Sequence, residues 1–349
     1  MSRILIALSG GVDSTAAASL LLEQGHACAG AHLWLFDGAR EAGDAEAAAE
    51  RLGLPFHVFD MRERFGREVI ARFAESYLRG ETPNPCVFCN RSIKFAALLE
   101  RAERLGYDAI ATGHYARTGF LNGRWLLKKA VDASKDQSYV LYMLTQSQLA
   151  YVKLPLGEMT KAQVRAYAEE MGFINARKKE SQDICFVPDG DYGAFLEGYI
   201  GQALHPGDFV DTAGRVLGKH RGMPRYTLGQ RKGLGLALPQ PGYVCGIDPI
   251  KNTVTVGDES QLFGKTLYAG DINLVPCDML PQPLRCKAKI RYRQAEQWAT
   301  AEQIGGDTLR ITFDEPQRAI TPGQAAVLYD GEYVIGGGTI LDDTNTAPC

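Results

Sequence analysis

Eight consecutive residues near the amino end have the composition of a turn that binds an anion. They are Ala7, Leu8, Ser9, Gly10, Gly11, Val12, Asp13 and Ser14. The apolar run before the glycines predicts a buried parallel strand, and the run from Thr15 predicts a helix that ends at Gly25. The glycines let the backbone approach a phosphate, while first-turn N–H groups and the helix dipole favour negative charge. Ser9 and Ser14 add hydroxyl donors, and the Asp13 carboxylate suits a Mg²⁺ ion that bridges phosphates.

This turn differs from two better-known nucleotide loops. It lacks the Gly-Lys-Ser/Thr ending of a Walker A loop and the Gly-x-Gly-x-x-Gly spacing. An ordinary strand-to-helix turn with two glycines is the alternative, which the complete hexapeptide Ser-Gly-Gly-Val-Asp-Ser disfavours. The hexapeptide resembles the pyrophosphate loop of the N-type ATP pyrophosphatases. That resemblance implies cleavage of ATP to AMP and pyrophosphate, with adenylation of a substrate oxygen.

Two cysteines, Cys86 and Cys89, follow a proline-rich stretch between two predicted helices. The prolines predict an exposed, stiff loop without helix, and the next helix is predicted over 91–105. Cys89 would then lie near a helix N-terminus, where we expect the pKa of its thiol to fall and its reactivity to rise. Cys185 lies in another polar stretch and is the candidate partner from a distant part of the chain.

Three interpretations of these cysteines compete: structural thiols, ligands of zinc or of an iron–sulfur cluster, or a pair that performs thiol chemistry. A four-cysteine metal site would need a second Cys-x-x-Cys, which the sequence lacks. ATP-dependent activation of an oxygen beside two reactive thiols suggests that a sulfur nucleophile displaces the activated oxygen. The remaining cysteines are interpreted as bystanders: Cys28, Cys245, Cys277, Cys286 and Cys349.

Several motifs stand in order along the chain: Ser-Gly-Gly-Val-Asp-Ser, Thr-Pro-Asn-Pro-x-x-x-Cys-Asn, Ile-Lys-Phe, Ala-Thr-Gly-His-Tyr-Ala, Lys-Asp-Gln-Ser-Tyr, Ile-Cys-Phe and Tyr-Thr-Leu-Gly-Gln-Arg-Lys-Gly-Leu-Gly. Together they resemble the family of bacterial tRNA-specific 2-thiouridylases over nearly the whole chain. The resemblance implies thiolation, at position 2, of the wobble uridine in the tRNAs for Lys, Glu and Gln. It also implies that Cys185 accepts a persulfide sulfur. Cys89 would be the second, nucleophilic cysteine, able to form a transient disulfide with Cys185.

The resemblance further implies where the ligands bind. ATP contacts carry over to residues 7–14, Leu33 and Gly113, and a cysteine desulfurase or a relay protein that carries a persulfide delivers the sulfur. A base stacked in a stem-loop must be extruded to reach ATP. The residues expected to contact tRNA are Asn84, Pro85 and Cys86 in the base pocket, His114 near it, Lys135, Asp136 and Gln137 in the catalytic domain, and Arg291, Tyr292 and Gln324 in the barrel. From the sequence alone, His114 is equally well a polar cap at a strand end.

One position departs from the pattern of the family, because many members have Asp at the position of Cys86. An alternative therefore has Cys86, Cys89 and Cys185 ligating an iron–sulfur cluster, with a fourth iron position open for sulfide. The segment after Phe36 is also shorter than in many members.

Basic residues are concentrated in two segments of the second half. Between Asp211 and Asp248 cations occur without any acid. In the second segment cations alternate with apolar residues at Arg285, Lys287, Lys289, Arg291 and Arg293. Period two predicts that these cations share one face of a strand, and a row of like charges needs an anionic partner. We expect this face to bind an RNA phosphate backbone, the alternative being a solvated strand face.

The elements that position these residues alternate between strand and helix in the first third of the chain. This pattern predicts an α/β fold, a doubly wound parallel sheet whose ligands lie at the carboxyl ends of the strands. Beyond residue 200, Gly, Pro and short β-prone runs predict barrel or sandwich structure. We expect an ATP-pyrophosphatase catalytic domain at 1–200, a small central domain at 201–264 and a C-terminal β-barrel at 265–349 that binds tRNA.

The length, composition and net charge of the chain exclude several classes of protein. The chain has 349 residues, 45% hydrophobic and 23% charged residues and a net charge of −3, which is typical of a globular protein and unfavourable for indiscriminate nucleic-acid binding. The sequence predicts no membrane span and no signal peptide, so we expect a cytoplasmic protein. We also expect a monomer. An amidotransferase-type ligase with the same loop and a non-enzymatic RNA-binding module with a structural metal are the competing hypotheses.

Overall fold

A parallel sheet forms the amino-terminal part of the computed structural model, which describes residues 1–37, 42–173 and 184–342. Its strand order is β3-β2-β1-β4-β7, and every pairing is parallel. The strands are β1 (Arg3–Ala7), β2 (Ala27–Trp34), β3 (Phe56–Asp60), β4 (Ala109–Ala111) and β7 (Val152–Lys153). The chain moves outward from β1 to β3 and then returns to place β4 on the other side of β1. This reversal creates a switch point beside β1, where ligands bind in doubly wound sheets; the predicted fold class is confirmed.

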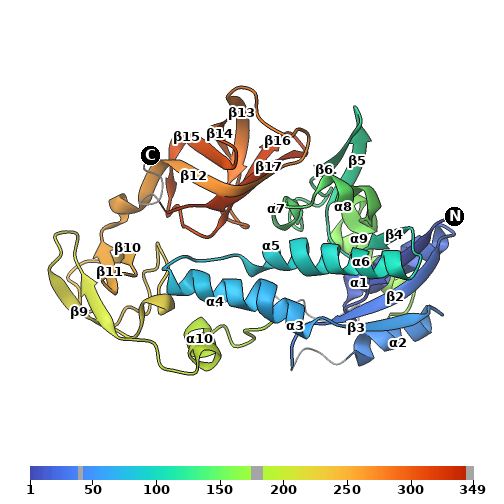
Figure 1. Cartoon of the computed structure of the whole chain (residues 1–349), viewed down its shortest axis with the longest axis horizontal. Coiled ribbons are helices and arrows are strands. Elements are labelled where there is room, and N and C mark those ends of the chain that lie inside the picture. Colours follow the sequence, from blue (N-terminus) through green and yellow to red (C-terminus); the bar gives the residue numbers. More distant parts are fainter. Residues whose placement is uncertain (38–41, 174–183, 343–349) are drawn as a thin grey trace.

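Helices connect and cover these strands (Figure 1). The first helix follows the glycine turn, and the helix that begins at Lys161 has a complete capping box made by Thr160 and Gln163. The helical segments are α1 (Val12–Glu23), α2 (Gly43–Arg51), α3 (Arg62–Phe65), η1 (Gly66–Ile70), α4 (Ala71–Leu78), α5 (Pro85–Cys89), η2 (Asn90–Ala97), α6 (Leu98–Arg104), α7 (Ser138–Leu141), α8 (Gln146–Tyr151), η3 (Pro155–Glu158), α9 (Lys161–Glu170) and α10 (Tyr192–Ile200).

The expectation of a helix-free loop around Cys86 and Cys89 is wrong. Pro85 occupies the first position of α5, where the missing N–H costs nothing, and the Asn84 side chain caps the helix by accepting from the Cys86 N–H. α5 continues without a break into η2, a segment of π-helix, and then α6. Cys89 therefore lies inside a long helix and not at its N-terminus.

A smaller mixed sheet follows α10, in the order β10-β11-β8-β9. Its elements are β8 (Gly207–Val210), β9 (Val216–His220), η5 (Met223–Arg225), β10 (Tyr243–Asp248) and β11 (Thr253–Gly257), with η6 (Glu259–Leu262) after them. Phe209, Val244 and Val254 are fully buried in a hydrophobic cluster of its own. Figure 1 shows this unit at the end of the molecule remote from the parallel sheet.

The last third closes into a six-stranded antiparallel barrel. The order is β12-β15-β14-β13-β16-β17, and an additional β12–β17 pairing closes the ring. The strands are β12 (Phe263–Leu274), β13 (Leu284–Lys289), β14 (Gln297–Gln303), β15 (Thr308–Arg318), β16 (Ala325–Asp330) and β17 (Tyr333–Ile340). Burial alternates along β13, with Cys286 and Ala288 inside. The predicted row of cations is wrong beyond Lys289, where the strand ends.

A hairpin from the amino-terminal part joins the barrel sheet. β5 (Arg117–Leu121) and β6 (Arg124–Lys128) are connected by Asn122-Gly123, both with positive φ, as a two-residue hairpin turn requires. Lys128 of β6 pairs with Tyr333 of β17. One hydrophobic cluster contains Leu5 and Ile110 of the parallel sheet together with Val327 of the barrel. The two units therefore share a core.

None of the helices in the described ranges is both long enough and apolar enough to cross a membrane.

Candidate active site

The glycine turn after β1 forms a tight cradle at the N-terminus of α1. Gly10 has φ +71°, and a Cβ there would lie 2.3 Å from the Asp44 Cβ. Ser14 Oγ donates to the Gly11 carbonyl at 3.0 Å and accepts from the Ser9 N–H at 3.2 Å. The backbone is therefore fixed around a concave turn whose helix N–H groups suit a phosphate.

Gly113, at the end of β4, packs directly on this turn. A Cβ at position 113 would lie 2.7 Å from the Asp13 carbonyl carbon and 2.8 Å from the Ser14 nitrogen. The switch point thus brings two distant glycine-containing segments into contact, and both line the same cleft.

Asp13 already has cationic and hydroxyl partners. Both carboxylate oxygens lie 2.8 Å from Lys161 Nζ, and Tyr115 donates its hydroxyl to Oδ1 at 2.7 Å. The Lys161 side chain is only 8% exposed. The charge of Asp13 is therefore shared with a lysine, so a Mg²⁺ ion on this carboxylate would have to compete with Lys161. Sequence reasoning missed Lys161 and Tyr115, because neither spacing nor composition links them to residue 13.

One cleft of about 1000 Å³ extends from the glycine turn to the barrel. It brings together many of the residues singled out from the sequence: Ala7, Ser9, Asp13, Ser14, Asn84, Cys86, Gly113, His114, Lys135, Asp136, Gln137 and Tyr292. Lys94, Lys161 and Lys289 also line it, so cations surround the cleft. Lys94 belongs to the Ile-Lys-Phe motif, which was the available signal for it.

Leu33 and Pro85 do not line this cleft. Leu33 is half-buried against two hydrophobic clusters, and Pro85 is buried at the start of α5. Cys89, Cys185, Arg291 and Gln324 also lie outside its lining among the described residues.

His114 is held as a neutral imidazole at the edge of the cleft. Its Nδ1 lies 2.8 Å from Thr112 Oγ1, and its ring is 5.6 Å from the Phe95 ring. Burial, helped by the nearby Lys94 ammonium, lowers the pKa of His114 to about 3. At neutral pH this ring therefore offers a hydrogen bond and an aromatic face, but no charge.

The thiol of Cys89 does not have the lowered pKa expected from the sequence. Cys89 is 6% exposed, and burial raises the pKa of its thiol to about 12. The expectation failed because α5 places this thiol in a hydrophobic cluster with Phe186 and Val187, away from any helix N-terminus. Lys94 opposes the rise, but burial dominates.

Cys89 and Cys185 nevertheless belong to one neighbourhood. The residues beside Cys185, Ile184 and Phe186, pack in the cluster that contains Cys89. The Cys185 charge raises the pKa of Cys89, and burial raises the pKa of Cys185 itself. Cys86 is exposed, and all three thiols are free. The stretch before Ile184, residues 174–183, lies outside the described residues.

Metal-ligand geometry is not found at these cysteines. In the described part of the chain, no group of three or more His, Cys, Asp or Glu side chains is arranged to hold a metal ion. The donor set Cys86, Cys89 and Cys185, all described, therefore does not fit a cluster in this conformation.

The predicted tRNA-contact loop at 135–137 is built from internal hydrogen bonds. Asp136 accepts from the Ala130 N–H at 3.0 Å and from the Ser138 hydroxyl at 2.7 Å. Gln137 Oε1 accepts from the Tyr115 N–H at 2.8 Å. The side chains of Asp136 and Gln137 thus fix the loop that presents Lys135 to the cleft.

Arg291 and Gln324 have structural partners at the barrel rim. Arg291 Nη2 donates to the Thr321 hydroxyl at 2.8 Å and to the Ala319 carbonyl at 3.1 Å, and burial lowers the pKa of Arg291. Gln324 Nε2 donates to the Thr82 carbonyl at 2.6 Å, two residues before the segment 84–86 that the sequence predicts to line a base pocket. Tyr292 is 38% exposed and does line the cleft.

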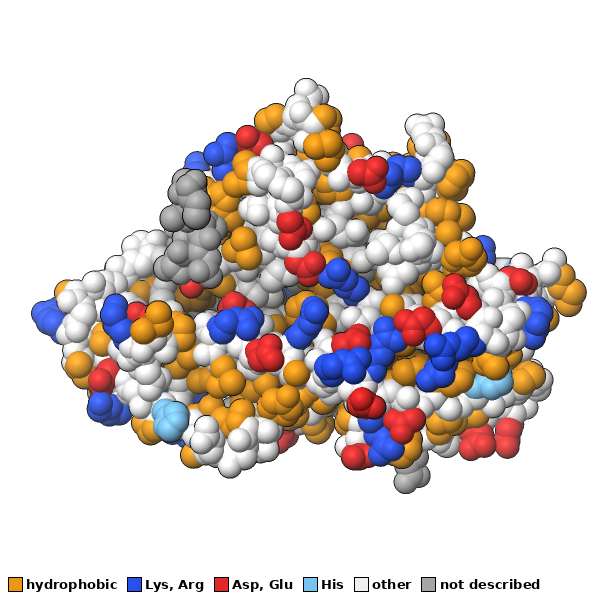
Figure 2. All heavy atoms as spheres, in the orientation of Figure 1, with side chains coloured by type: hydrophobic (Ala, Val, Ile, Leu, Met, Phe, Trp, Pro, Cys, Tyr) orange, Lys and Arg blue, Asp and Glu red, His pale blue; other side chains and the backbone are white. Residues whose placement is uncertain are grey.

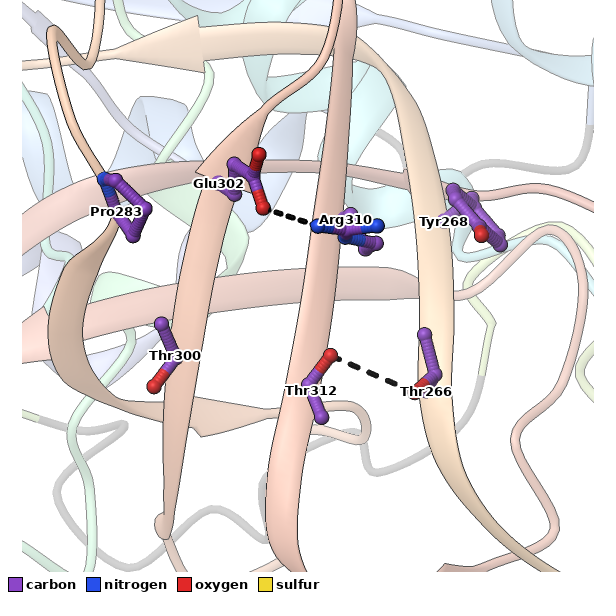
Figure 3. A pocket seen from close by; sticks show the side chains of 7 residues that line it. All are labelled: Thr266, Tyr268, Pro283, Thr300, Glu302, Arg310 and Thr312. Atoms are coloured by element: carbon purple, nitrogen blue, oxygen red, sulfur yellow. Dashed lines mark hydrogen bonds and ion pairs between the residues drawn. The ribbon is translucent and has the colours of Figure 1, made fainter. Parts of the chain in front are cut away.

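A second hollow, of about 750 Å³, lies on the outer face of the barrel (Figure 3). Its floor is formed by β12, β14 and β15, where Arg310 pairs with Glu302 and the Thr266 and Thr312 hydroxyls are 3.5 Å apart. No residue singled out from the sequence lines it, and it contains neither a thiol nor a histidine. We therefore assign the active site to the larger cleft.

The glycine turn at the switch point of a parallel sheet, followed by a small sheet and a barrel, is the arrangement of a class of proteins whose three family models match this chain in the same order. The model of the tRNA methyl transferase HUP domain matches residues 2–189, that of the tRNA methyl transferase PRC-barrel domain residues 193–258, and that of the aminomethyltransferase β-barrel domain residues 264–340.

The tRNA-specific 2-thiouridylase MnmA of Carboxydothermus hydrogenoformans is 50% identical to this chain, and the alignment covers 97% of each. The same enzyme of Moorella thermoacetica is 50% identical, over 96% of this chain and 98% of the relative. That of Symbiobacterium thermophilum is 48% identical, over 97% and 92%. The chain belongs to the family of the tRNA-specific 2-thiouridylases.

Proposed function

We propose that this chain is a tRNA-uridine 2-sulfurtransferase, which uses ATP to replace the C2 oxygen of the wobble uridine in tRNA (Lys, Glu, Gln) by sulfur. The observation that carries the proposal is one continuous cleft. It has a phosphate cradle at Ser9–Ser14, the capped helix start at Asn84–Cys86 farther along, and the neighbourhood of Cys89 and Cys185 beside it. An oxygen that is activated at the phosphate cradle can be replaced by a sulfur from the cysteines only if the two places lie next to each other.

ATP is the substrate of the first step. The residues proposed to hold it are the glycine turn, Gly113 and Leu33, with the phosphates at the N-terminus of α1. Asp13 is the carboxylate that would hold a Mg²⁺ ion, in competition with Lys161, and the ion would neutralise charge on the phosphates. The C2 oxygen of the uridine attacks the α-phosphorus, pyrophosphate leaves, and the uracil loses its N3 proton. Lys161 and the helix N-terminus stabilise the charge that develops on the phosphates.

The uridine enters the cleft as a flipped base. Asn84, Pro85 and Cys86 form the proposed pocket, and the neutral ring of His114 lies near it. Because His114 carries no charge at neutral pH, it orients the base by contact and hydrogen bonding rather than by acting as an acid. Lys135–Gln137, Arg291, Tyr292 and Gln324 contact the rest of the anticodon arm.

Sulfur transfer uses the two cysteines in sequence. The terminal sulfur of a persulfide on Cys185 attacks C2, and AMP leaves with the oxygen. Cys89 then attacks the Cys185 sulfur of the remaining S–S bond, which leaves the new sulfur on C2 and a Cys89–Cys185 disulfide that an external thiol reduces. Since burial raises the pKa of the Cys89 thiol to about 12, this step needs a rearrangement that exposes Cys89.

The remaining expectations complete the proposal. A protein that carries a persulfide, a cysteine desulfurase or a relay protein, supplies sulfur to Cys185. The enzyme acts as a cytoplasmic monomer. Its domains span 1–200, 201–264 and 265–349. An iron–sulfur cluster on Cys86, Cys89 and Cys185 is not favoured, and iron and sulfide analysis of anaerobically purified protein tests it.

The test is to measure release of AMP and pyrophosphate, and 2-thiouridine, with tRNA and a sulfur donor. We expect all three products from the wild type, and Cys185→Ser should lose thiolation while retaining ATP binding. Retained thiolation in Cys185→Ser would refute the persulfide step. AMP release without thiolated tRNA would indicate an amidotransferase-type ligase, and tight zinc without ATP turnover would indicate an RNA-binding module.

A further inference from the structure

A hollow of about 500 Å³ lies where the central sheet meets the barrel. It is lined by Gly229, Gln230, Arg231, Lys232, Tyr243 and Arg318. None of these residues lines the active-site cleft, and none is among the proposed tRNA contacts. We call the part formed by residues 229–232 the seam loop. It belongs to the motif Tyr-Thr-Leu-Gly-Gln-Arg-Lys-Gly-Leu-Gly, to which the proposed mechanism gives no role.

The basic residues between Asp211 and Asp248 differ in how they are paired. Arg215 pairs with Asp211 and Lys219 with Asp208, both at 2.7 Å. Arg225 pairs with Asp191 at 3.1 Å and with Glu197 at 2.9 Å. The predicted cationic character of this segment is therefore largely neutralised within the protein.

Arg231 and Lys232 are different, because both side chains are exposed and neither has an ion-pair partner among the described residues. Arg318, from the end of β15, lies beside them over the Tyr243 ring at 5.4 Å, and its Nε is 3.2 Å from Glu259. Three cations from two domains thus border one hollow, and of these Arg318 is paired with Glu259.

The seam loop is held from several sides. Gln230 Oε1 accepts from the Thr227 N–H at 3.0 Å, and Gln230 Nε2 donates to the Lys232 carbonyl at 3.0 Å. The Gly229 N–H donates to the Val244 carbonyl at 2.8 Å, and Gly229 has φ +83°. Arg318 Nη2 donates to the Gly229 carbonyl at 3.4 Å. The turn is therefore preorganised, which lowers the entropy cost of binding through its two exposed cations.

We propose that the seam loop with Arg318 binds the phosphodiester backbone of the tRNA at a point away from the flipped base. Adjacent unpaired cations on a chain of net charge −3 fit a polyanion, and Arg318 stacked on Tyr243 offers a planar surface to a ribose or a base. The proposal rests on the proposed function, since it assumes that tRNA is the substrate. The seam loop would be a second contact between protein and tRNA, and this contact would position the anticodon arm at the cleft.

The test compares two double variants by the salt dependence of full-length tRNA binding. Arg231→Ala/Lys232→Ala removes the unpaired cations, and Arg215→Ala/Lys219→Ala removes paired cations of the same domain. For two lost phosphate contacts we expect the slope of log K against log salt to shrink by about 1.4–1.8, and affinity to fall at least tenfold at low salt. The control variant should keep the wild-type slope.

A slope in the seam-loop variant equal to that of the wild type overturns the proposal, and so does an equal loss in both variants. Loss of binding to the sulfur-donor protein, with tRNA binding intact, would overturn it in favour of a protein-docking surface. A short anticodon stem-loop serves as the second substrate: if the variant still thiolates it, the proposed function stands whatever the slope. If the wild type thiolates neither RNA, the proposed function fails instead.

A separate observation concerns Asn90, which is 2% exposed and lines the active-site cleft. Its Nδ2 donates to the Val140 carbonyl at 3.0 Å, and a carbonyl only accepts, so the orientation of the amide is fixed. Its Oδ1 has no hydrogen-bond partner in the described parts of the chain. A buried acceptor without a donor destabilises the protein, and a bound donor would remove that penalty.

We infer that Asn90 Oδ1 accepts the N3–H of the substrate uracil before activation. At N3 uracil has a donor, whereas cytosine has a lone pair that would face the oxygen, so Asn90 would discriminate uridine from cytidine. This inference also rests on the proposed function. Because Oδ1 is covered in the free protein, the base would displace neighbouring side chains as it enters, a change that is common on binding.

The readout is the ratio of affinities for tRNA with U or C at the wobble position. In Asn90→Leu we expect this ratio to fall about tenfold or more toward one, while Asn90→Asp, which keeps an acceptor, should retain most of it. An unchanged ratio in a folded Asn90→Leu overturns the inference. If the leucine variant does not fold, Asn90→Ser is measured in the same way. Thiolation of wild-type substrate tests the proposed function independently.

Discussion

The Asp13–Lys161 pair beneath the phosphate cradle shows how single residues prepare this site. Lys161 is at the first position of α9, where a cation is unfavourable, yet both Asp13 oxygens lie 2.8 Å from its ammonium. The Asp13 carboxylate holds the Lys161 ammonium next to the cradle before any nucleotide arrives. A phosphate therefore meets an electrostatic environment that needs little reorganisation.

Because of His114, we expect the stability of the folded protein to fall as the pH is lowered into the acid range. Its folded pKa, about 3, lies below its ordinary value of 6.5, so protonation favours the unfolded chain and stability is lost as the pH falls through this window. We expect the wild type to lose about 1–2 kcal/mol more than His114→Asn between pH 7.5 and pH 5. Urea unfolding at both values measures this, with His205→Asn, at an exposed position, as the control. Equal losses in wild type and His114→Asn would contradict the assignment.

The reactivity of the cysteines should follow burial. With a pKa of about 12, Cys89 is about one part in ten thousand thiolate at pH 8, so iodoacetamide should modify exposed Cys86 well before buried Cys89. Quantitative mass spectrometry of modified peptides measures the order. On addition of ATP and tRNA we expect Cys89 to become reactive, whereas buried Cys286 in the barrel stays protected. Modification of Cys89 as fast as Cys86 in the free protein would disprove this.

At the scale of elements, contact between the end of β4 and the start of α1 defines the nucleotide site. Gly113→Ala would put a Cβ 2.7 Å from the Asp13 backbone and force the two segments apart. We expect ATP affinity to fall at least tenfold, with a loss of about 1–3 kcal/mol of stability from the overpacking. Gly198→Ala in α10 is the matched control, since a Cβ there would meet nothing within 4 Å and the residue lies outside the glycine turn. Binding titration and thermal unfolding measure both, and equal effects would refute the contact argument.

Sequence patterns predicted the parallel strands well, because buried parallel strands are nearly continuous apolar runs. The same reasoning failed at Pro85, where proline at the first position of a helix is favourable and Asn84 caps it. That one error placed Cys89 at a helix N-terminus and reversed the direction of its pKa shift. Contacts such as Lys161 with Asp13 join residues far apart in sequence, and no local signal encodes them.

At the scale of the molecule, the catalytic sheet and the barrel depend on one another. Their shared cluster includes Leu5, Ile110, Val327 and Tyr329, and Arg117 forms a 2.6 Å ion pair with Glu332. We therefore expect a fragment of residues 1–200 to expose part of its core and to aggregate or remain only partly folded, as measured by circular dichroism and size-exclusion chromatography. A monomeric, cooperatively unfolding fragment would contradict this. Co-expression with residues 201–349 is the control and should restore solubility.

Over the whole molecule, acidic and basic side chains are mixed, and neither sign dominates the surface in view in Figure 2. On the face in Figure 2, basic and acidic side chains intermingle along the middle of the molecule. Sequence composition predicted the small net charge but not which cations have partners, because that depends on acids far along the chain, such as Asp191 and Glu197, which pair with Arg225. We therefore expect selectivity for RNA to depend on a few exposed cations at defined places.

The β5–β6 hairpin pairs with β17 and so connects the parallel-sheet part of the chain to the barrel. This connection limits how far these two parts can move apart. A wide opening between these two parts would have to break the shared sheet and the shared core. We therefore expect the changes that admit a nucleic acid to stay local, at side chains and loops around the cleft, while the reacting base is extruded from its own stack.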